Sequence, residues 1–215
     1  FRPTLPLMRT KQLAALVDQA RRMGCPTTMH VNAVESVRRG IAAGVHSIVH
    51  TATDAFLTAS DAQAMLGAGV IWEPTLSVMF EFAYPLDGCF AARDPRLAQL
   101  AQYRRRTIDS IAETFWHARL ADSVRAAVAR LDRQRTRALG WIELSPMIRV
   151  SGHLMAYGLP NTQQLWDGGV LFACGNDAGM PPCTPAMVGL ELALCAELLE
   201  RVKPVQLLRM ATING

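Results

Sequence analysis

Short apolar runs alternate with amphipathic stretches along the first third of the chain. The runs from Cys25 to Val31 and from Ser47 to His50 predict strands, and the stretch from Ala33 to Ala43, which stops at Gly44, predicts a helix. A strand, a helix and a second strand in this order place the two strands parallel and side by side. A preceding helix is predicted by apolar residues at helical spacing, namely Leu13, Leu16, Val17, Ala20 and Met23.

The same alternation returns toward the C-terminus. We expect a strand from Gly69 to Leu76, with Pro74 near its end, and a near-continuous apolar strand from Val170 to Gly175. Helix starts are predicted at the capping residues Thr10, Ser60, Asn161 and Thr184. Strands that alternate with helices define an α/β chain with a parallel sheet.

Two histidines and an aspartate come at the carboxyl ends of these predicted strands. His30 and His50 close the first two strands, and Asp177 follows the last. Taken singly, each has an ordinary structural explanation, because a buried histidine is often a satisfied core residue and an aspartate often caps a turn or helix. Together, if their strands share one barrel, two imidazoles and a carboxylate form a donor set that suits zinc, and a catalytic zinc site keeps one position open for water.

The segments that carry these residues resemble strands five, six and eight of the amidohydrolase superfamily, above all its imidazolonepropionase-like and Xaa-Pro-dipeptidase-like branch. The matching segments are Met29 to Gly40, Gly44 to His50 and Gly175 to Gly179. The resemblance implies a (β/α)8 TIM-type barrel. It also implies that His30 and His50 ligate one or two divalent ions, most readily zinc, and that Asp177 is both a metal contact and the general base. Asn32 and Asn176 are candidates for hydrogen bonds behind these ligands.

Two motifs of that superfamily are absent from the sequence. No His-x-His pair occurs, and the only lysines, Lys11 and Lys203, fall on predicted helices. We therefore expect a partial barrel, strands five to eight, from a longer protein. Its expected divisions are residues 1–80 for strands five to seven, 81–161 for a helical insertion and 162–215 for the last strand and its helices. Expressed alone, these 215 residues are expected to be inactive and prone to aggregate through open sheet edges.

The insertion is expected to form a lid or wall, because it leaves the carboxyl end of strand seven. Its polar aromatic residues either touch substrate or pack the insertion itself: Tyr84, Tyr103, Trp116, His117, His153 and Tyr157. Its arginines are expected to form a solvated helix face, although one could hold a substrate carboxylate. His46 precedes its strand and is expected at the opposite end of the barrel.

Composition narrows the class of protein without choosing a substrate. Half of the 215 residues are hydrophobic, and the net charge of +4 is mild. No clustered aromatic residues or docking motif indicate nucleic-acid binding, and no apolar stretch is long enough for a membrane span. Five cysteines without a Cys-x-x-Cys pair argue against a disulfide or zinc-ribbon framework. The cytoplasm is the favoured compartment, and a homo-oligomer is compatible with the sequence.

The expected function is hydrolysis of a carbon–nitrogen bond, in an amide, a cyclic amide or a dipeptide-like small molecule, by metal-activated water. The alternative is a non-catalytic or degenerate barrel fragment that serves as a scaffold or assembly subunit, which the missing His-x-His pair supports. A metal-independent barrel lyase or isomerase is a third option, for which the histidines and aspartate at strand ends would be a coincidence. An upstream strand that ends in His-x-His would favour the hydrolase.

Overall fold

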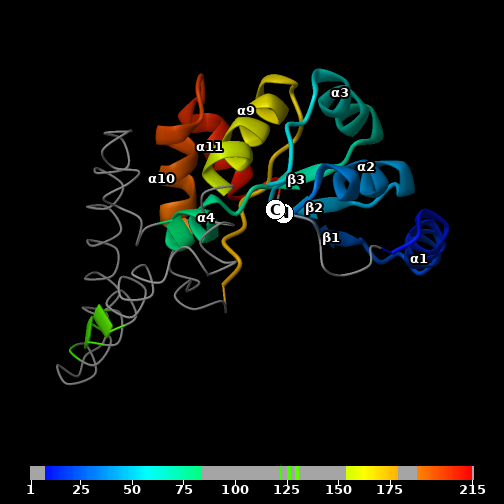
Figure 1. The fold of residues 1–215 in the computed structure, drawn as a ribbon, viewed down its shortest axis with the longest axis horizontal. Coiled ribbons are helices and arrows are strands. Elements are labelled where there is room, and N and C mark those ends of the chain that lie inside the picture. Colours follow the sequence, from blue (N-terminus) through cyan, green and yellow to red (C-terminus); the bar gives the residue numbers. More distant parts are fainter. Residues whose placement is uncertain are drawn as a thin grey trace.

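The fold was analysed in a computed structural model, which describes residues 8–83, 122, 125–126, 129–130, 154–178 and 188–214. At its centre, three strands form a parallel sheet in the order β1 (Thr28–His30), β2 (Ser47–Val49) and β3 (Ile71–Glu73), as Figure 1 shows. The register pairs His30 with Val49 and Val49 with Glu73. The predicted α/β class and the parallel pairing of the first two strands are confirmed.

Helices separate the strands in the order that the sequence predicts. They are α1 (Thr10–Arg22), α2 (Val34–Ala43) and α3 (Ala59–Ala68), and each packs against the next. Gly44 ends α2 with a φ of 70°, a left-handed conformation that glycine adopts without a steric penalty. The chain can therefore turn at once into β2, which fixes the position of His50 at the far end of that strand.

The remaining helices lie beyond β3, on the side of the sheet away from α1 (Figure 1). They are α4 (Leu76–Ala83), the π-helix η3 (Leu154–Gly158), α9 (Leu159–Asp167), α10 (Val188–Leu198) and α11 (Pro204–Met210). Helix α9 packs on α3, and α10 packs on both α4 and α11. Among the described residues, no helix combines the length and the apolar character that crossing a membrane requires.

The predicted fourth strand lies beside β3 as a short extended segment. Trp72 donates from its backbone N–H to the carbonyl of Leu171 at 2.8 Å, and Ala173 donates to the carbonyl of Trp72 at 2.9 Å. The parallel bridge between Trp72 and Phe172 places this segment fourth in the row, after β3. Closure of such a row into a barrel stays a prediction. The predicted helical insertion, residues 81–161, lies mostly outside the described residues, and the predicted division of the chain stays a prediction.

Several element boundaries differ from those predicted. Thr10 and Ser60 lie inside their helices, because Arg9 and Thr58 are the N-cap residues of α1 and α3. The strand expected from Gly69 to Leu76 is shorter, because Leu76 already begins α4. Asn161 does not cap a helix start; it lies inside α9, where its side-chain oxygen accepts from the N–H of Leu57 at 2.7 Å and its amide donates to Ala52 and Ala55, both at 2.9 Å. Asn161 thus fastens the loop that follows β2 and His50.

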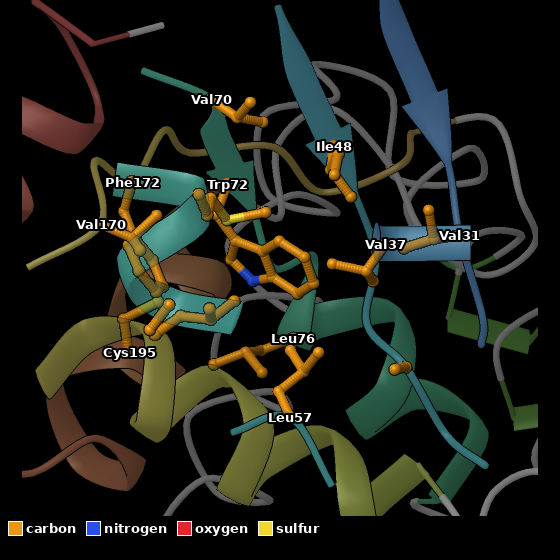
Figure 2. Packing of buried hydrophobic residues seen from close by; sticks show 14 of the residues in the cluster. Val31, Val37, Ile48, Leu57, Val70, Trp72, Leu76, Val170, Phe172 and Cys195 are labelled. Carbon is orange, nitrogen blue, oxygen red and sulfur yellow. The ribbon is translucent and has the colours of Figure 1, made fainter. Parts of the chain in front are cut away.

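The core surrounds the indole of Trp72, which is fully buried. Figure 2 shows this ring between Val170 and Phe172 on one side and Ile48 and Val37 on the other. The ring therefore packs between the extended segment beside β3 on one side and β2 with α2 on the other.

We expect Trp72→Ala to lower the free energy of unfolding by about 3–5 kcal/mol, because it leaves a large cavity in the core. Leu208→Ala, at a side chain 64% exposed, serves as the matched control and should change stability by less than about 0.5 kcal/mol. Chemical denaturation of both variants measures the difference. Equal stabilities would show that Trp72 is not central to the core.

Candidate functional site

The carboxyl ends of the strands bring His30 and His50 into contact. His30 is the last residue of β1, and His50 comes directly after β2. Their ring centroids lie 4.5 Å apart, with the ring planes at 72°. The expected convergence of the two imidazoles is therefore observed, whereas their role as metal ligands stays a prediction.

His50 also contacts a residue at the carboxyl end of β3. Its Nδ1 shares a hydrogen bond of 2.7 Å with the Thr75 hydroxyl, which leaves Nε2 as the nitrogen free of that bond. Burial lowers the pKa of His50, the nearby His30 lowers it further, and Asp177 opposes both. A lowered pKa favours the neutral imidazole, which is the form that binds metal.

Asp177 follows the extended segment beside β3, and its side chain is exposed. The carboxylate lies close enough to act electrostatically on His50. The structure thus places Asp177 at the same end of the sheet as the two histidines. Asn32 is exposed and Asn176 is 6% exposed; the expected support of the ligands by these two side chains stays a prediction.

The backbone is strained at this end of the sheet. His50, Thr75 and Asp177 have φ angles of 68°, 49° and 49°, and they are three of the four non-glycine residues with positive φ in the described part of the chain. Such conformations cost on the order of 1–3 kcal/mol each, and a β-branched residue such as threonine rarely adopts them. Strain that gathers at three adjacent strand ends indicates a site whose geometry serves a function.

The sequence analysis did not single out Glu73, although it ends β3 as His30 ends β1. The register places His30, Val49 and Glu73 on the same face of the sheet. A Cβ at Gly175 would come within 2.9 Å of the Glu73 carboxylate oxygen Oε2, so glycine leaves room for that side chain. The position of Glu73 at a strand end was the signal that could have identified it.

Cys174 lies near this carboxylate but is poorly suited to nucleophilic chemistry. Burial raises the pKa of the Cys174 thiol to about 12, and Glu191 and Glu73 add to the shift. The thiolate, which is the reactive form, is therefore scarce at neutral pH. Cys25 is exposed, whereas Cys195 is buried.

The donor set fits zinc in chemistry, but it is incomplete. Neutral imidazoles and a carboxylate are common zinc ligands, and the Thr75 hydroxyl is the kind of partner that orients a metal-binding histidine. Within residues 8–83 and the other described ranges, no group of three or more histidine, cysteine, aspartate or glutamate side chains is arranged to hold a metal ion. The His30 and His50 pair therefore fits as part of a metal site.

Other predicted residues lie elsewhere or outside the described ranges. His46 precedes β2 and lines a cavity of about 380 Å³ together with Arg21 and Cys25, at the amino-terminal end of the strands, as expected. Tyr157 packs against Phe56 with ring centroids 4.8 Å apart. The other residues of that predicted set lie outside the described part of the chain: Tyr84, Tyr103, Trp116, His117 and His153.

Comparison with solved structures places this α/β arrangement within known folds. The ochratoxinase of A. niger matches 99% of this chain with a TM-score of 0.57 and 17% identity, over 35% of its own length. A Xaa-Pro dipeptidase, solved with methionine in its active site, matches 96% of this chain with a TM-score of 0.59 and 16% identity, over 37% of its own length. A candidate prolidase from Bifidobacterium longum matches 95% with a TM-score of 0.62 and 18% identity, over 38% of its length.

At these identities the likeness shows the fold, which this chain shares with part of each neighbour. The neighbours are hydrolytic enzymes by name, and the chain spans between 35% and 38% of their lengths. No protein-family model matches the sequence. No curated protein matches it either.

Proposed function

We propose that this chain is part of a metal-dependent hydrolase of the amidohydrolase superfamily, which cleaves a carbon–nitrogen bond in an amide, a cyclic amide or a dipeptide. The observation that carries the proposal is the contact between His30 and His50 at the ends of adjacent parallel strands, with Asp177 at the same end. A partial TIM-type barrel accounts for that arrangement, because active sites of this fold gather at the carboxyl ends of the strands.

In this proposal the two histidines hold the ion through their ring nitrogens. His50 would use Nε2, since Nδ1 is engaged with Thr75. His30 stands against the same ring and would supply the second nitrogen. Asp177 would be a further metal contact, as the resemblance implies. Among the described residues no group of three such side chains is arranged to hold an ion, so the remaining ligands would come from residues beyond the described ones.

Asp177 would handle the proton of the reaction. When bound, a divalent ion such as Zn²⁺ lowers the pKa of a water molecule toward about 7 and polarises the substrate carbonyl. Asp177 accepts a proton from the attacking water as the oxygen–carbon bond forms. It then returns that proton to the leaving nitrogen as the carbon–nitrogen bond breaks, so that the carboxylate is regenerated.

Specificity in barrel enzymes lies in the loops, so the class of substrate is proposed here as amides and dipeptides. The name of one neighbour makes Xaa-Pro dipeptides the first compounds to assay. Simple amides are the second class to assay. A small molecule of this class is the partner we propose.

We expect the full-length protein to lose this hydrolysis when a chelator removes its metal, and to regain it on addition of zinc, because water at neutral pH is a poor nucleophile without the ion. The assay measures release of free amine before and after metal removal. Unchanged hydrolysis in protein shown to be metal-free would contradict the proposal. Absence of both metal and hydrolysis would favour the scaffold alternative.

A further inference from the structure

A buried carboxylate from α10 holds the first turn of α4. Glu191 lies in α10 and is fully buried. Both of its carboxylate oxygens accept backbone hydrogen bonds, from the N–H of Leu76 at 2.8 Å and from the N–H of Ser77 at 2.6 Å. These two residues begin α4, so a side chain from α10 holds the first turn of another helix, more than a hundred residues away in sequence.

Burying a carboxylate is costly, and few glutamates are fully buried. Burial raises the pKa of Glu191 to about 7, although the hydrogen bonds from Ser77 and Leu76 oppose this shift. An apolar side chain of similar size would avoid this cost in a helix that packs on α4 and α11. The carboxylate instead accepts two hydrogen bonds at the start of α4, directly after Thr75.

Glu191 holds the residues that directly follow Thr75. Thr75 is 3% exposed and has a φ of 49°, which a β-branched residue rarely adopts. Its hydroxyl shares the 2.7 Å hydrogen bond with Nδ1 of His50. The hydrogen bonds from Leu76 and Ser77 to Glu191 restrict the backbone directly after Thr75. They therefore stabilise the positive φ of Thr75, which sets the direction of its hydroxyl.

We propose that Glu191 is a positioning residue, which acts through Leu76, Ser77 and the strained Thr75 to fix the orientation and the tautomer of His50. The part of this proposal that concerns metal binding rests on the proposed function; the orientation of His50 does not. Glu191 itself touches neither substrate nor metal. A carboxylate that served only to cap α4 would stabilise the protein but would leave the His50 ring unchanged.

The first experiment reads His50 in metal-free, full-length protein labelled with ¹⁵N-histidine. In the wild type we expect His50 to hold a single tautomer, with Nδ1 in the hydrogen bond that it shares with the Thr75 hydroxyl. Glu191→Gln turns one acceptor into a donor that faces a backbone N–H, so we expect a shifted or broadened His50 signal. Thr75→Val should produce the same change, and Thr75→Ser, which keeps the hydroxyl, should restore the wild-type signal.

Matched controls separate this effect from general loss of stability. Glu197→Gln makes the same change at an exposed position of α10 and should leave His50 unaltered. The His46 signal, from the opposite end of β2, should stay constant in every variant. If Glu191→Gln does not fold, Glu191→Asp keeps the carboxylate but shortens its reach, and we expect a smaller displacement of His50. A His50 signal identical to wild type in the folded Glu191 variant would overturn the proposal.

The second experiment is a double-mutant cycle on zinc affinity. Loss of groups behind a metal-binding histidine typically weakens metal affinity about 10–100-fold, and we expect such a loss for Glu191→Gln and for Thr75→Val. Both substitutions act through the one hydrogen bond between Thr75 and His50. The double variant should therefore lose little more zinc affinity than the single variant that binds zinc less tightly. Additive losses would contradict the proposal. Absence of zinc binding in the wild type would instead refute the proposed function, while the ¹⁵N measurement would still decide the role of Glu191.

Discussion

Replacing Asp177 with asparagine is expected to lower turnover of the full-length protein by about 10²–10⁴-fold. Asparagine keeps the size of the side chain and one oxygen, but it cannot accept the proton of the attacking water at neutral pH. The side chain is exposed and follows the extended segment beside β3, so the substitution should not disturb the core. Steady-state kinetics with a simple amide or a Xaa-Pro dipeptide measures the loss, which should fall mainly on kcat.

Asp18→Asn provides the control for this prediction. Asp18 is an exposed residue of α1, where it pairs with Arg22, and the same chemical change there should leave kcat within about twofold. Metal content should fall less than turnover in Asp177→Asn, since the two histidines remain. Wild-type turnover in Asp177→Asn would show that another group takes the proton.

His30→Ala and His50→Ala are each expected to remove most of the bound metal without unfolding the protein. His30 is exposed and His50 is half-buried, so neither substitution should open a large cavity. Each would remove one of the two imidazoles whose ring centroids lie 4.5 Å apart. Removing a residue that only hydrogen-bonds to a metal ligand lowers metal affinity by up to about 100-fold, and we expect removal of a ligand itself to lower zinc affinity at least as much. Metal analysis after dialysis, together with far-ultraviolet circular dichroism, measures both properties.

His46→Ala is the matched control for these two variants. His46 lies at the opposite end of β2 and lines the cavity with Arg21 and Cys25, away from the strand ends that carry the site. We expect wild-type metal content in this variant. Full metal occupancy in both His30→Ala and His50→Ala would remove their assignment as ligands.

The arrangement of the first two strands was predictable because the helical run between them is short and well marked. A strand, a helix and a strand in this order allow few topologies, and parallel pairing places the strand ends together. The convergence of His30 and His50 followed from that rule alone. The position of the segment from Leu171 to Ala173 beside β3 was expected only from the resemblance to strand eight. It is observed, but its ladder is a single bridge rather than a full strand.

Contacts between distant segments could not be read from local patterns. Glu191 is a polar residue within an apolar helix, and its bonds to Leu76 and Ser77 depend on how α10 packs on α4. The 2.7 Å contact of Thr75 with His50 depends on a positive φ that no residue type near Thr75 indicates. Asn161 was expected to cap a helix because asparagine often does so. Its side chain instead makes three hydrogen bonds with the loop after β2.

Anomalous diffraction at the zinc edge, from crystals of the zinc-loaded, full-length protein, tests the proposed site most directly. We expect an anomalous peak about 2.0–2.1 Å from Nε2 of His50 and from a ring nitrogen of His30, with the Asp177 carboxylate facing the ion. The same peak should weaken or vanish in crystals of His50→Ala. A single strong peak elsewhere in the protein, with His30 and His50 free of metal in an active preparation, would contradict the assignment of this site.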